Sequence, residues 1–208
     1  MEGATIYRFT AEIFGEEEGN PSELYLHLNH ADALKLLETH LTTPNLVKHC
    51  LAAEAVLGRV AESLEEDQPQ WKLCGLLHDI DYDLTAEQPE RHTLAAEEIL
   101  LEQGIDGPII EAIKGHNDLA PRESKLAKAL WAVDPLTGLI VAAALISPDK
   151  KLAGIDVSFV CNRMKEKSFA RAVSREKIAS FEQLGSSVES FIGLGLEAMQ
   201  KIAPQLGL

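Results

Sequence analysis

The sequence contains few cysteines and few aromatic residues, and each shortage excludes a class of protein. Its 208 residues include three cysteines, Cys50, Cys74 and Cys161, which form no CxxC pair. We therefore expect reduced thiols in the core, with no disulfide framework and no cysteine-rich structural zinc site. Aromatic residues make up 5% of a chain that is 46% hydrophobic. The core must then consist mainly of Leu, Ala, Ile and Val, which favours helices, and we expect both tryptophans to lie in it.

Basic residues are scarce as well. The chain has 19 Lys and Arg against 33 Asp and Glu, which gives a formal net charge of −14. A surface this acidic argues against binding to a nucleic acid duplex or an anionic membrane. It leaves room for a small phosphorylated substrate, because a bound cation dominates the field around it.

The chain also lacks the patterns of export and membrane insertion. Residues 1–20 contain no basic segment followed by a long apolar run, so we expect no signal peptide. The longest apolar stretch, Leu139–Ile146, is too short to cross a bilayer. We therefore expect a soluble, cytoplasmic protein, and the sequence is compatible with a homodimer.

Strand-like alternation is scarce, whereas helical spacing of apolar residues fills most of the chain after residue 28. We predict an all-α bundle of about eight helices over residues 29–208. Within it we expect a metal-binding core at about 45–146 and C-terminal helices at 156–203. We expect residues 1–28, which include a polar break, to form an N-terminal extension.

Local signals place several helix boundaries. Asn29 is a plausible N-cap, Gly104 follows the end of a helix, and Pro108 begins the next one. The dipeptide at 134–135, Asp-Pro, is expected to interrupt a long apolar helix. Residues 158–173 read as one further helical pattern.

Adjacent His78 and Asp79 end an apolar segment in "CGLLHDIDYD". His49 lies near the apolar face of a predicted helix, and Asp134 lies in the most apolar helix of the chain. An unpaired carboxylate buried there would cost several kcal/mol unless a metal or a hydrogen-bonding partner compensates it. Histidine and aspartate ligands without thiolates suit Fe, Mn, Zn, Ni or Mg.

Each of these residues has a simpler interpretation when it is considered alone. His49 could be a satisfied core histidine, and Asp134 could cap a helix that restarts at the following proline. Together with the His-Asp pair, they favour a metal site. His27, His30 and His40 belong to no such set of candidate ligands and are expected to be surface or capping residues.

The order of His49, the His78-Asp79 pair and Asp134 resembles the HD-domain superfamily of metal-dependent phosphohydrolases. His92 and His116 between them resemble the extra ligands of its HDIG-type, two-metal branch. The resemblance covers roughly residues 45–146 and implies one or two divalent metal ions per chain. The implied ligands of the first ion are His49, His78, Asp79 and Asp134.

The resemblance further implies that Asp79 bridges to a second ion held by His92 and His116. These two histidines could instead hydrogen-bond a substrate phosphate. A metal-bound water would attack phosphorus, and the expected catalytic residues are Asp79 and Asp81. Asp81 or Asp83 could also orient a ligand histidine or a water molecule.

The chain departs from the family pattern after the His-Asp pair. Asp81 stands where HDIG has glycine, and Tyr82 stands where a lysine follows in the family. No lysine is therefore present at that position to fill its role. The GYP motif of cyclic-di-GMP phosphodiesterases is absent, and we do not assign that substrate.

A basic cluster follows later in the chain. Lys167, Arg171 and Arg175 are candidates for binding substrate phosphate, and the two arginines, four residues apart, would share one helical face. Salt bridges to the acidic surface are the simpler interpretation.

The resemblance thus leads us to expect a metal-dependent phosphohydrolase that acts on a small phosphorylated compound, such as a nucleotide. Hydrolysis of a phosphomonoester and of a phosphodiester both fit. The alternative is a non-catalytic HD-like domain that binds a ligand or carries a signal.

Overall fold

The computed structural model describes residues 28–105 and 107–208, so all but the last residue of the expected extension, with His27, lies outside the described part. That part contains helices and turns and no strand. Eight of its α-helices have nine or more residues, which confirms the predicted all-α bundle. They are α2 (His30–His40), α3 (Pro44–Ser63), α4 (Gln68–Leu77), α6 (Leu94–Glu102), α7 (Pro108–His116), α8 (Lys125–Ile146), α9 (Val157–Lys165) and α11 (Val188–Lys201).

Shorter helical pieces connect these elements. Three are α-helical: α5 (Tyr82–Thr85), α10 (Arg175–Ala179) and α12 (Ala203–Leu206). Three are 3₁₀ turns: η2 (Pro89–Arg91), η3 (Leu152–Gly154) and η4 (Ser180–Leu184).

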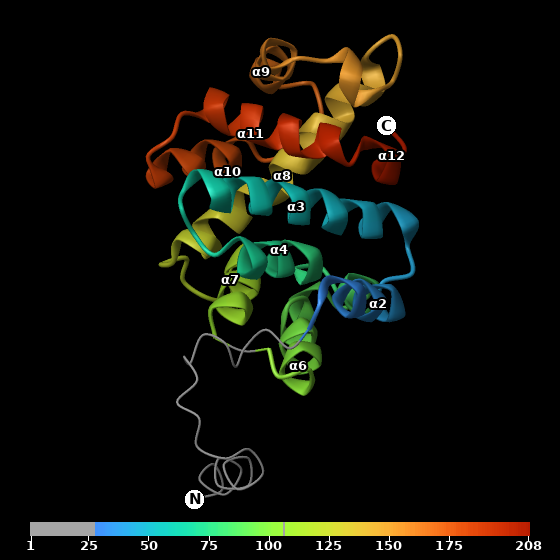
Figure 1. The fold of residues 1–208 in the computed structure, drawn as a ribbon, viewed down its shortest axis with the longest axis vertical. Helices are drawn as coiled ribbons and strands as arrows, with labels where there is room; N and C mark the ends of the chain where they lie inside the picture. Colours follow the sequence, from blue (N-terminus) through green and yellow to red (C-terminus); the bar gives the residue numbers. More distant parts are fainter. Residues whose placement is uncertain (1–27, 106) are drawn as a thin grey trace, which may run out of the picture.

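Helix α3 lies at the centre of the bundle. Figure 1 shows it between α4 on one side and α11 on the other, with α8 crossing behind, and α3 contacts all three helices. Its buried face consists of small and branched apolar residues, among them Ala53, Val56, Leu57 and Val60, each fully buried. This short-side-chain face lets neighbouring helices approach closely.

Gly75 makes the contact between α3 and α4 possible. A Cβ atom at this position would lie 2.7 Å from both the carbonyl oxygen of Ala53 and the backbone nitrogen of Glu54. Only glycine allows the two backbones to come this near. The close approach fixes the end of α4, where the His-Asp pair follows.

The local signals for helix boundaries are confirmed. Asn29 accepts a hydrogen bond from the backbone nitrogen of Asp32 and caps α2. Gly104 follows α6 with a φ of +72°, and Pro108 is the first residue of α7.

The prediction of a break at residues 134–135 is wrong. Helix α8 runs without interruption from Lys125 to Ile146 and contains Pro135. A proline inside a helix costs about 3 kcal/mol. Burial offsets this cost, because each fully buried side chain such as Leu136 or Ile140 contributes about 1.5–3 kcal/mol.

Helix α8 is also long and apolar enough to cross a membrane by length and composition. Its best 18-residue window has a mean hydropathy of 1.9 and is 56% buried within the fold. The helix contacts α3, α7, α9, α10 and α11, so most of its apolar surface already faces protein. Its hydropathy therefore reflects a position in the core of the bundle.

The predicted helix over 158–173 is too long. Helix α9 ends at Lys165, and residues 167–172 form turns, with Ala170 at a φ of +41°. Trp131 differs from expectation as well, because it is only partly buried, whereas Trp71 is 2% exposed.

Candidate metal centre

The structure brings the six predicted ligands to one place from five parts of the chain. They are His49 on α3, His78 and Asp79 after α4, His92 before α6, His116 at the end of α7, and Asp134 on α8. Five of them line one pocket, whose residues are Leu46, His49, Asp79, Tyr82, His92, His116, Asn117, Asp134 and Lys177.

Asp79 lies at the middle of the cluster, and its two carboxylate oxygens face different histidines. Oδ2 lies 3.6 Å from Nε2 of His49 and 3.5 Å from Nε2 of His78. Oδ1 lies 3.4 Å from Nε2 of His92 and 3.3 Å from Nε2 of His116. Each oxygen thus forms one candidate metal site with two histidines.

The end of α4 explains how adjacent residues can share a site. Inside a helix, the side chains of His78 and Asp79 would point about 100° apart. The helix ends at Leu77, and the chain continues in turns up to Asp81. The nitrogen of Tyr82 donates to the carbonyl oxygen of Asp79 at 3.0 Å and closes this bend.

Backbone carbonyls fix the protonation of two histidines. Nδ1 of His78 lies 2.8 Å from the oxygen of Gly75, and Nδ1 of His116 lies 2.6 Å from the oxygen of Ile113. A carbonyl can only accept, so each Nδ1 carries the hydrogen. In the neutral ring, Nε2 then presents its lone pair to the centre.

The hydroxyl of Thr137 fixes the protonation of His49. Its hydroxyl donates to the carbonyl oxygen of Asp134 at 2.8 Å and lies 3.0 Å from Nδ1 of His49. A hydroxyl has one hydrogen, so Thr137 must accept from His49. Nε2 of His49 therefore faces Asp134 Oδ1, 3.2 Å away, and the other ligands. Sequence reasoning missed Thr137, because a threonine three residues after Asp134 gives no signal of its own.

Asp81 orients His92 through the ring nitrogen that faces away from Asp79. Its fully buried carboxylate accepts from Nδ1 of His92 at 2.9 Å. It also accepts from the backbone nitrogens of Thr93 at 2.7 Å and Ala96 at 3.1 Å, and so caps the start of α6. Thr93 has a φ of +72°, which is costly for a β-branched residue. Asp81 does not line the pocket, so it positions His92 and does not reach a substrate there.

The donor set fits metal ions. When the rings are neutral, no hydrogen lies between Nε2 of His49 and Nε2 of His78, 3.2 Å apart, or between those of His92 and His116, 3.3 Å apart. Facing lone pairs repel each other unless a cation lies between them. Two nitrogens bound at about 2.1 Å to one tetrahedral ion would be about 3.4 Å apart.

The charges of the ligands favour a cation as well. Burial works against the ionised form of Asp79, but His78, His116 and His92 outweigh it and hold its pKa well below the ordinary value. Burial lowers the pKa of His78 to about 4, so this ring is neutral near pH 7. Burial also opposes protonation of His92, but hydrogen bonds with Asp79 and Asp81 raise its pKa to about 9. An ion at His92 must therefore displace a proton.

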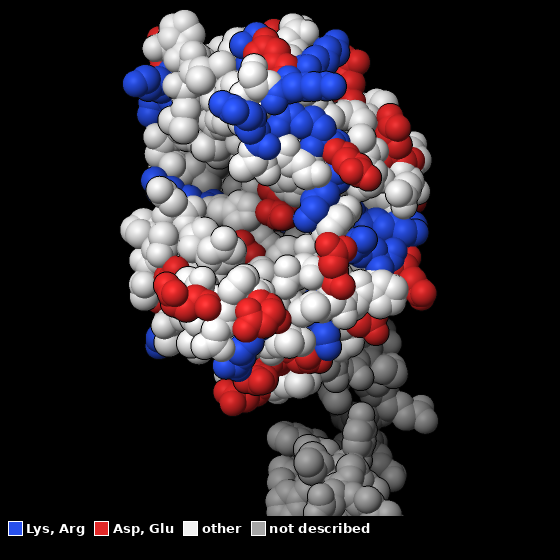
Figure 2. Space-filling model, turned by 180° about the vertical axis from the view of Figure 1, so that it is seen from behind, with Lys and Arg blue, Asp and Glu red and all other residues white. Residues whose placement is uncertain are grey.

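The pocket over the centre has a volume of about 430 Å³. Lys177, on α10, is the only Lys or Arg that lines it among residues 28–105 and 107–208. Its position in the sequence gave no sign of this role. Figure 2 shows one face of the molecule, hollowed across its middle, with acidic side chains in the hollow and a group of Lys and Arg to one side.

The structure does not bring the three predicted phosphate-binding residues into this pocket. Lys167 and Arg171 are exposed in the segment after α9, and Arg175 begins α10, so the arginines share no helical face. The guanidinium of Arg175 donates to the carbonyl oxygens of Ala170 at 2.6 Å and Val173 at 2.8 Å. These hydrogen bonds stabilise the turn, and they occupy the N–H groups of the guanidinium that would otherwise bind phosphate.

Asp83 likewise has a structural contact. It accepts hydrogen bonds from the backbone nitrogens of Thr42 at 2.7 Å and Thr43 at 2.9 Å, and from both of their hydroxyls. Thr43 is the N-cap of α3 and makes no side-chain cap of its own. Asp83 caps α3 in its place and orients no ligand histidine.

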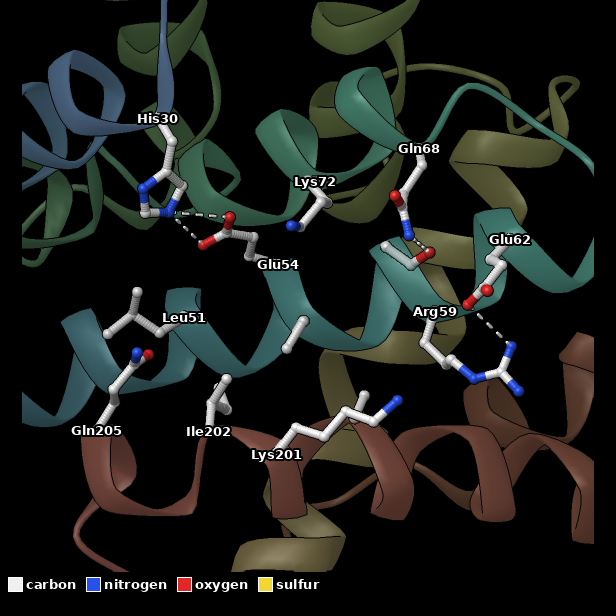
Figure 3. Close-up of a pocket in the computed structure, with 13 residues that line it drawn as sticks. His30, Leu51, Glu54, Arg59, Glu62, Gln68, Lys72, Lys201, Ile202 and Gln205 are labelled. Atoms are coloured by element: carbon white, nitrogen blue, oxygen red, sulfur yellow. Dashed lines mark hydrogen bonds and ion pairs between the residues drawn. The ribbon is translucent and has the colours of Figure 1, made fainter.

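A separate hollow of about 320 Å³ lies between α3, α4 and the C-terminal helices (Figure 3). In it, the buried carboxylate of Glu54 lies 3.0 Å from Nε2 of His30, and Arg59 pairs with Glu62 at 3.3 Å. His30 is thus an exposed residue that pairs with Glu54, as expected for a surface histidine. No candidate metal ligand lines this hollow.

Comparisons with known proteins agree with the geometry. A family model described as the HD domain matches residues 46–149. The Ribonuclease Y of Nitratidesulfovibrio vulgaris (strain DP4) is 32% identical over 117 residues, which are 54% of this chain and 22% of that protein. The Ribonuclease Y of Salinispora tropica is 29% identical over 94 residues, 45% of this chain and 16% of that protein.

The chain thus spans about a fifth of the length of these curated relatives. No solved structure matches it. The family match covers half of the chain and includes all six histidines and aspartates of the centre. On these grounds, the chain belongs to the HD-domain family.

Proposed function

We propose that this protein is a metal-dependent phosphohydrolase that cleaves a phosphate ester of a small phosphorylated compound, in particular a nucleotide. The observation that carries the proposal is the position of Asp79, whose two oxygens each face a different pair of histidines. Two ions bridged by one carboxylate suit hydrolysis at phosphorus.

In this proposal, the first ion is held by His49, His78, Asp79 and Asp134, and the second by Asp79, His92 and His116. Imidazole ligands favour Fe, Ni or Zn, and carboxylate ligands also suit Mn or Mg. When bound, the ions neutralise charge on the phosphate and lower the pKa of a coordinated water.

The protein's own residues supply orientation and access. Asp81 and Thr137 keep Nε2 of their histidines directed at the centre. Lys177 offers an ammonium group to phosphate oxygens that enter the pocket. Tyr82, 45% exposed at the same pocket, is available for a nucleobase to stack on, which supports a nucleotide substrate.

The relatives support hydrolysis of phosphate esters in nucleic acid or its fragments, since their name describes ribonucleases. The net charge of −14 favours a small substrate over a duplex. We propose action on mononucleotides or short oligonucleotides, by phosphomonoester or phosphodiester cleavage, in the cytoplasm and away from membranes.

The test combines metal analysis with a substrate panel. Wild-type protein, purified without oxygen, should contain stoichiometric divalent metal and should hydrolyse at least one member of a set of nucleotides and generic phosphate esters. Asp79→Ala should lose both metal and turnover. Asp149→Ala removes an exposed carboxylate elsewhere and should change neither.

The alternative of a non-catalytic module makes different predictions. A module without metal would show no stoichiometric ion in the wild type. A metal-containing module would bind ions and give no turnover with any member of the panel. Either result would contradict the proposed hydrolase.

A further inference from the structure

A second hollow, of about 590 Å³, adjoins the pocket over the metal centre. The two share Lys177, and the α7–α8 connection supplies Asn117 to one and Asp118 to the other. The residues that line the second hollow are Asp118, Arg122, Lys128, Trp131, Ser174, Glu176, Lys177, Ser180 and Gln183.

Helix α8 links the two pockets along one face. Lys128 and Trp131 line the second hollow, and Asp134, three residues further on, belongs to the metal centre. Residues three apart lie on one side of a helix. With a rise of 1.5 Å per residue, Lys128 lies about 9 Å along the axis from Asp134. A group held in the second hollow is therefore near the metal centre.

The second hollow carries uncompensated positive charge. Arg122 pairs with Asp118 at 2.7 Å. Lys128 and Lys177 are both partly buried, and neither has a carboxylate within 4.0 Å in the described part of the chain. The one other acidic residue in the lining, Glu176, is exposed. Lys114, by comparison, is also partly buried and pairs with Glu97 at 2.8 Å.

Trp131 holds Lys177 in place. The ammonium nitrogen of Lys177 lies 3.5 Å from the centre of the tryptophan ring, and Cζ of Arg122 lies 3.8 Å from it. Such cation–π contacts contribute about 0.5–2 kcal/mol and limit the motion of the lysine. Lys177 is thereby kept where it lines both pockets. Lysines without carboxylate partners in an acidic protein attract an anion.

We propose that the second hollow is an anion subsite, so that the enzyme prefers phosphate esters with a second phosphate near the one that is cleaved. Lys177 contacts both phosphates, and Lys128 contacts only the second. The proposal rests on the proposed function and narrows its substrate class. The second phosphate belongs to a bisphosphorylated nucleoside or to the 5′ end of a short oligonucleotide, and the test separates the two.

The kinetic test compares substrates with and without the second phosphate. One arm compares adenosine 3′,5′-bisphosphate with adenosine 5′-monophosphate, and the other compares a 5′-phosphorylated dinucleotide with the same dinucleotide without that phosphate. In at least one arm, the wild type should prefer the bisphosphorylated substrate about tenfold in kcat/KM. Lys128→Gln should remove most of this preference, and Lys128→Arg should keep it.

Lys125→Gln is the matched control. Lys125 lies on the same helix, is exposed and pairs with Glu66 at 2.6 Å, outside both pockets. Lys125→Gln removes the same charge as Lys128→Gln and should keep the substrate preference of the wild type. Equal preferences in Lys128→Gln and Lys125→Gln, or no preference in the wild type, would overturn the subsite.

A binding measurement separates this inference from the proposed hydrolysis. Calorimetric titration with adenosine 3′,5′-bisphosphate requires no turnover. About tenfold weaker binding by Lys128→Gln than by Lys125→Gln supports the subsite even if no ester is hydrolysed. Equal binding by the two variants overturns the subsite. It does not affect the hydrolase proposal, which the substrate panel tests separately.

Discussion

Nδ1 of His92 donates a hydrogen bond to the buried carboxylate of Asp81 at 2.9 Å. The same carboxylate caps α6 through two backbone nitrogens. A metal-ligating histidine needs such a partner to keep its other nitrogen aimed at the ion. This contact gives Asp81, which stands where the HDIG pattern has glycine, a specific role in the proposed second metal site.

We predict that Asp81→Ala weakens binding of the second ion and leaves binding of the first ion unchanged. His92 loses its orientation, so the affinity of the second site should fall about 10–100-fold. Titration of apoprotein with Mn²⁺ or Zn²⁺ should then show one tight ion in place of two. Asp83→Ala is the control and should retain both ions, because the carboxylate of Asp83 hydrogen-bonds Thr42 and Thr43 at the start of α3. Two tight ions in Asp81→Ala would contradict the assigned role.

Thr137 provides the corresponding test of the first site. Thr137→Val keeps the shape of the side chain and removes the hydroxyl that accepts from His49. We expect about tenfold weaker binding of the first ion, and Thr137→Ser should restore it. The metal titration detects both changes. Unchanged binding in Thr137→Val would mean that His49 needs no partner at Nδ1.

Gly75 is predicted to be irreplaceable for packing reasons. In Gly75→Ala, the added Cβ would press on the backbone of α3, which cannot move aside as a flexible side chain would. We expect a loss of about 1–3 kcal/mol in the free energy of unfolding, measured by urea denaturation of the apoprotein. Gly138 offers the opposite case, since an added Cβ would lie 3.6 Å from the side chain of Val173, an ordinary van der Waals distance. Gly138→Ala should be neutral or stabilising by up to about 1 kcal/mol. Equal effects of the two changes would contradict this packing argument.

The cap that Asp83 provides to α3 should depend on pH. Slight burial opposes ionisation, but hydrogen bonds from Thr43 and Thr42 hold the pKa of Asp83 below its ordinary value. The unfolded chain has a pKa of about 3.9 at this residue. The stabilisation is therefore present above pH of about 3.9 and is lost as pH falls through the lower pKa of the folded state.

Asp83→Ala should accordingly reduce the free energy of unfolding by about 1 kcal/mol at pH 7. The difference between variant and wild type should shrink in acid, below the pH at which the unfolded carboxyl titrates. Urea denaturation of both proteins over a pH series measures this. A difference that stays constant into strong acid would show that the carboxylate charge is not responsible.

Several features could be predicted from the sequence because they depend on local patterns. Asn29 and Gly104 act at single helix ends, where residue type and neighbours decide the structure. The histidines and aspartates of the centre were predicted as one site because their order along the chain resembles a known family. The side chains that hold them, Thr137 above all, depend on how α3 and α8 pack and leave no local pattern.

Tertiary packing also explains the wrong predictions. Pro135 ends a helix by local rules, but burial of α8 on several neighbours outweighs its cost. Arg171 and Arg175 have helical spacing, yet Arg175 donates to carbonyls of the preceding segment and stabilises a turn there. Lys177 reaches the metal pocket only because α10 contacts α8. None of these contacts follows from the spacing of residues in the sequence.

The central claim is that Asp79 holds one ion on each carboxylate oxygen. A crystal structure of metal-loaded protein, with anomalous scattering to locate the ions, tests it most directly. We predict two ions about 3.5–4 Å apart, one with His49, His78 and Asp134, the other with His92 and His116, and Asp79 bound to both. A loaded crystal with no ion between the histidine pairs, or with Asp79 outside the coordination of every ion, would contradict it.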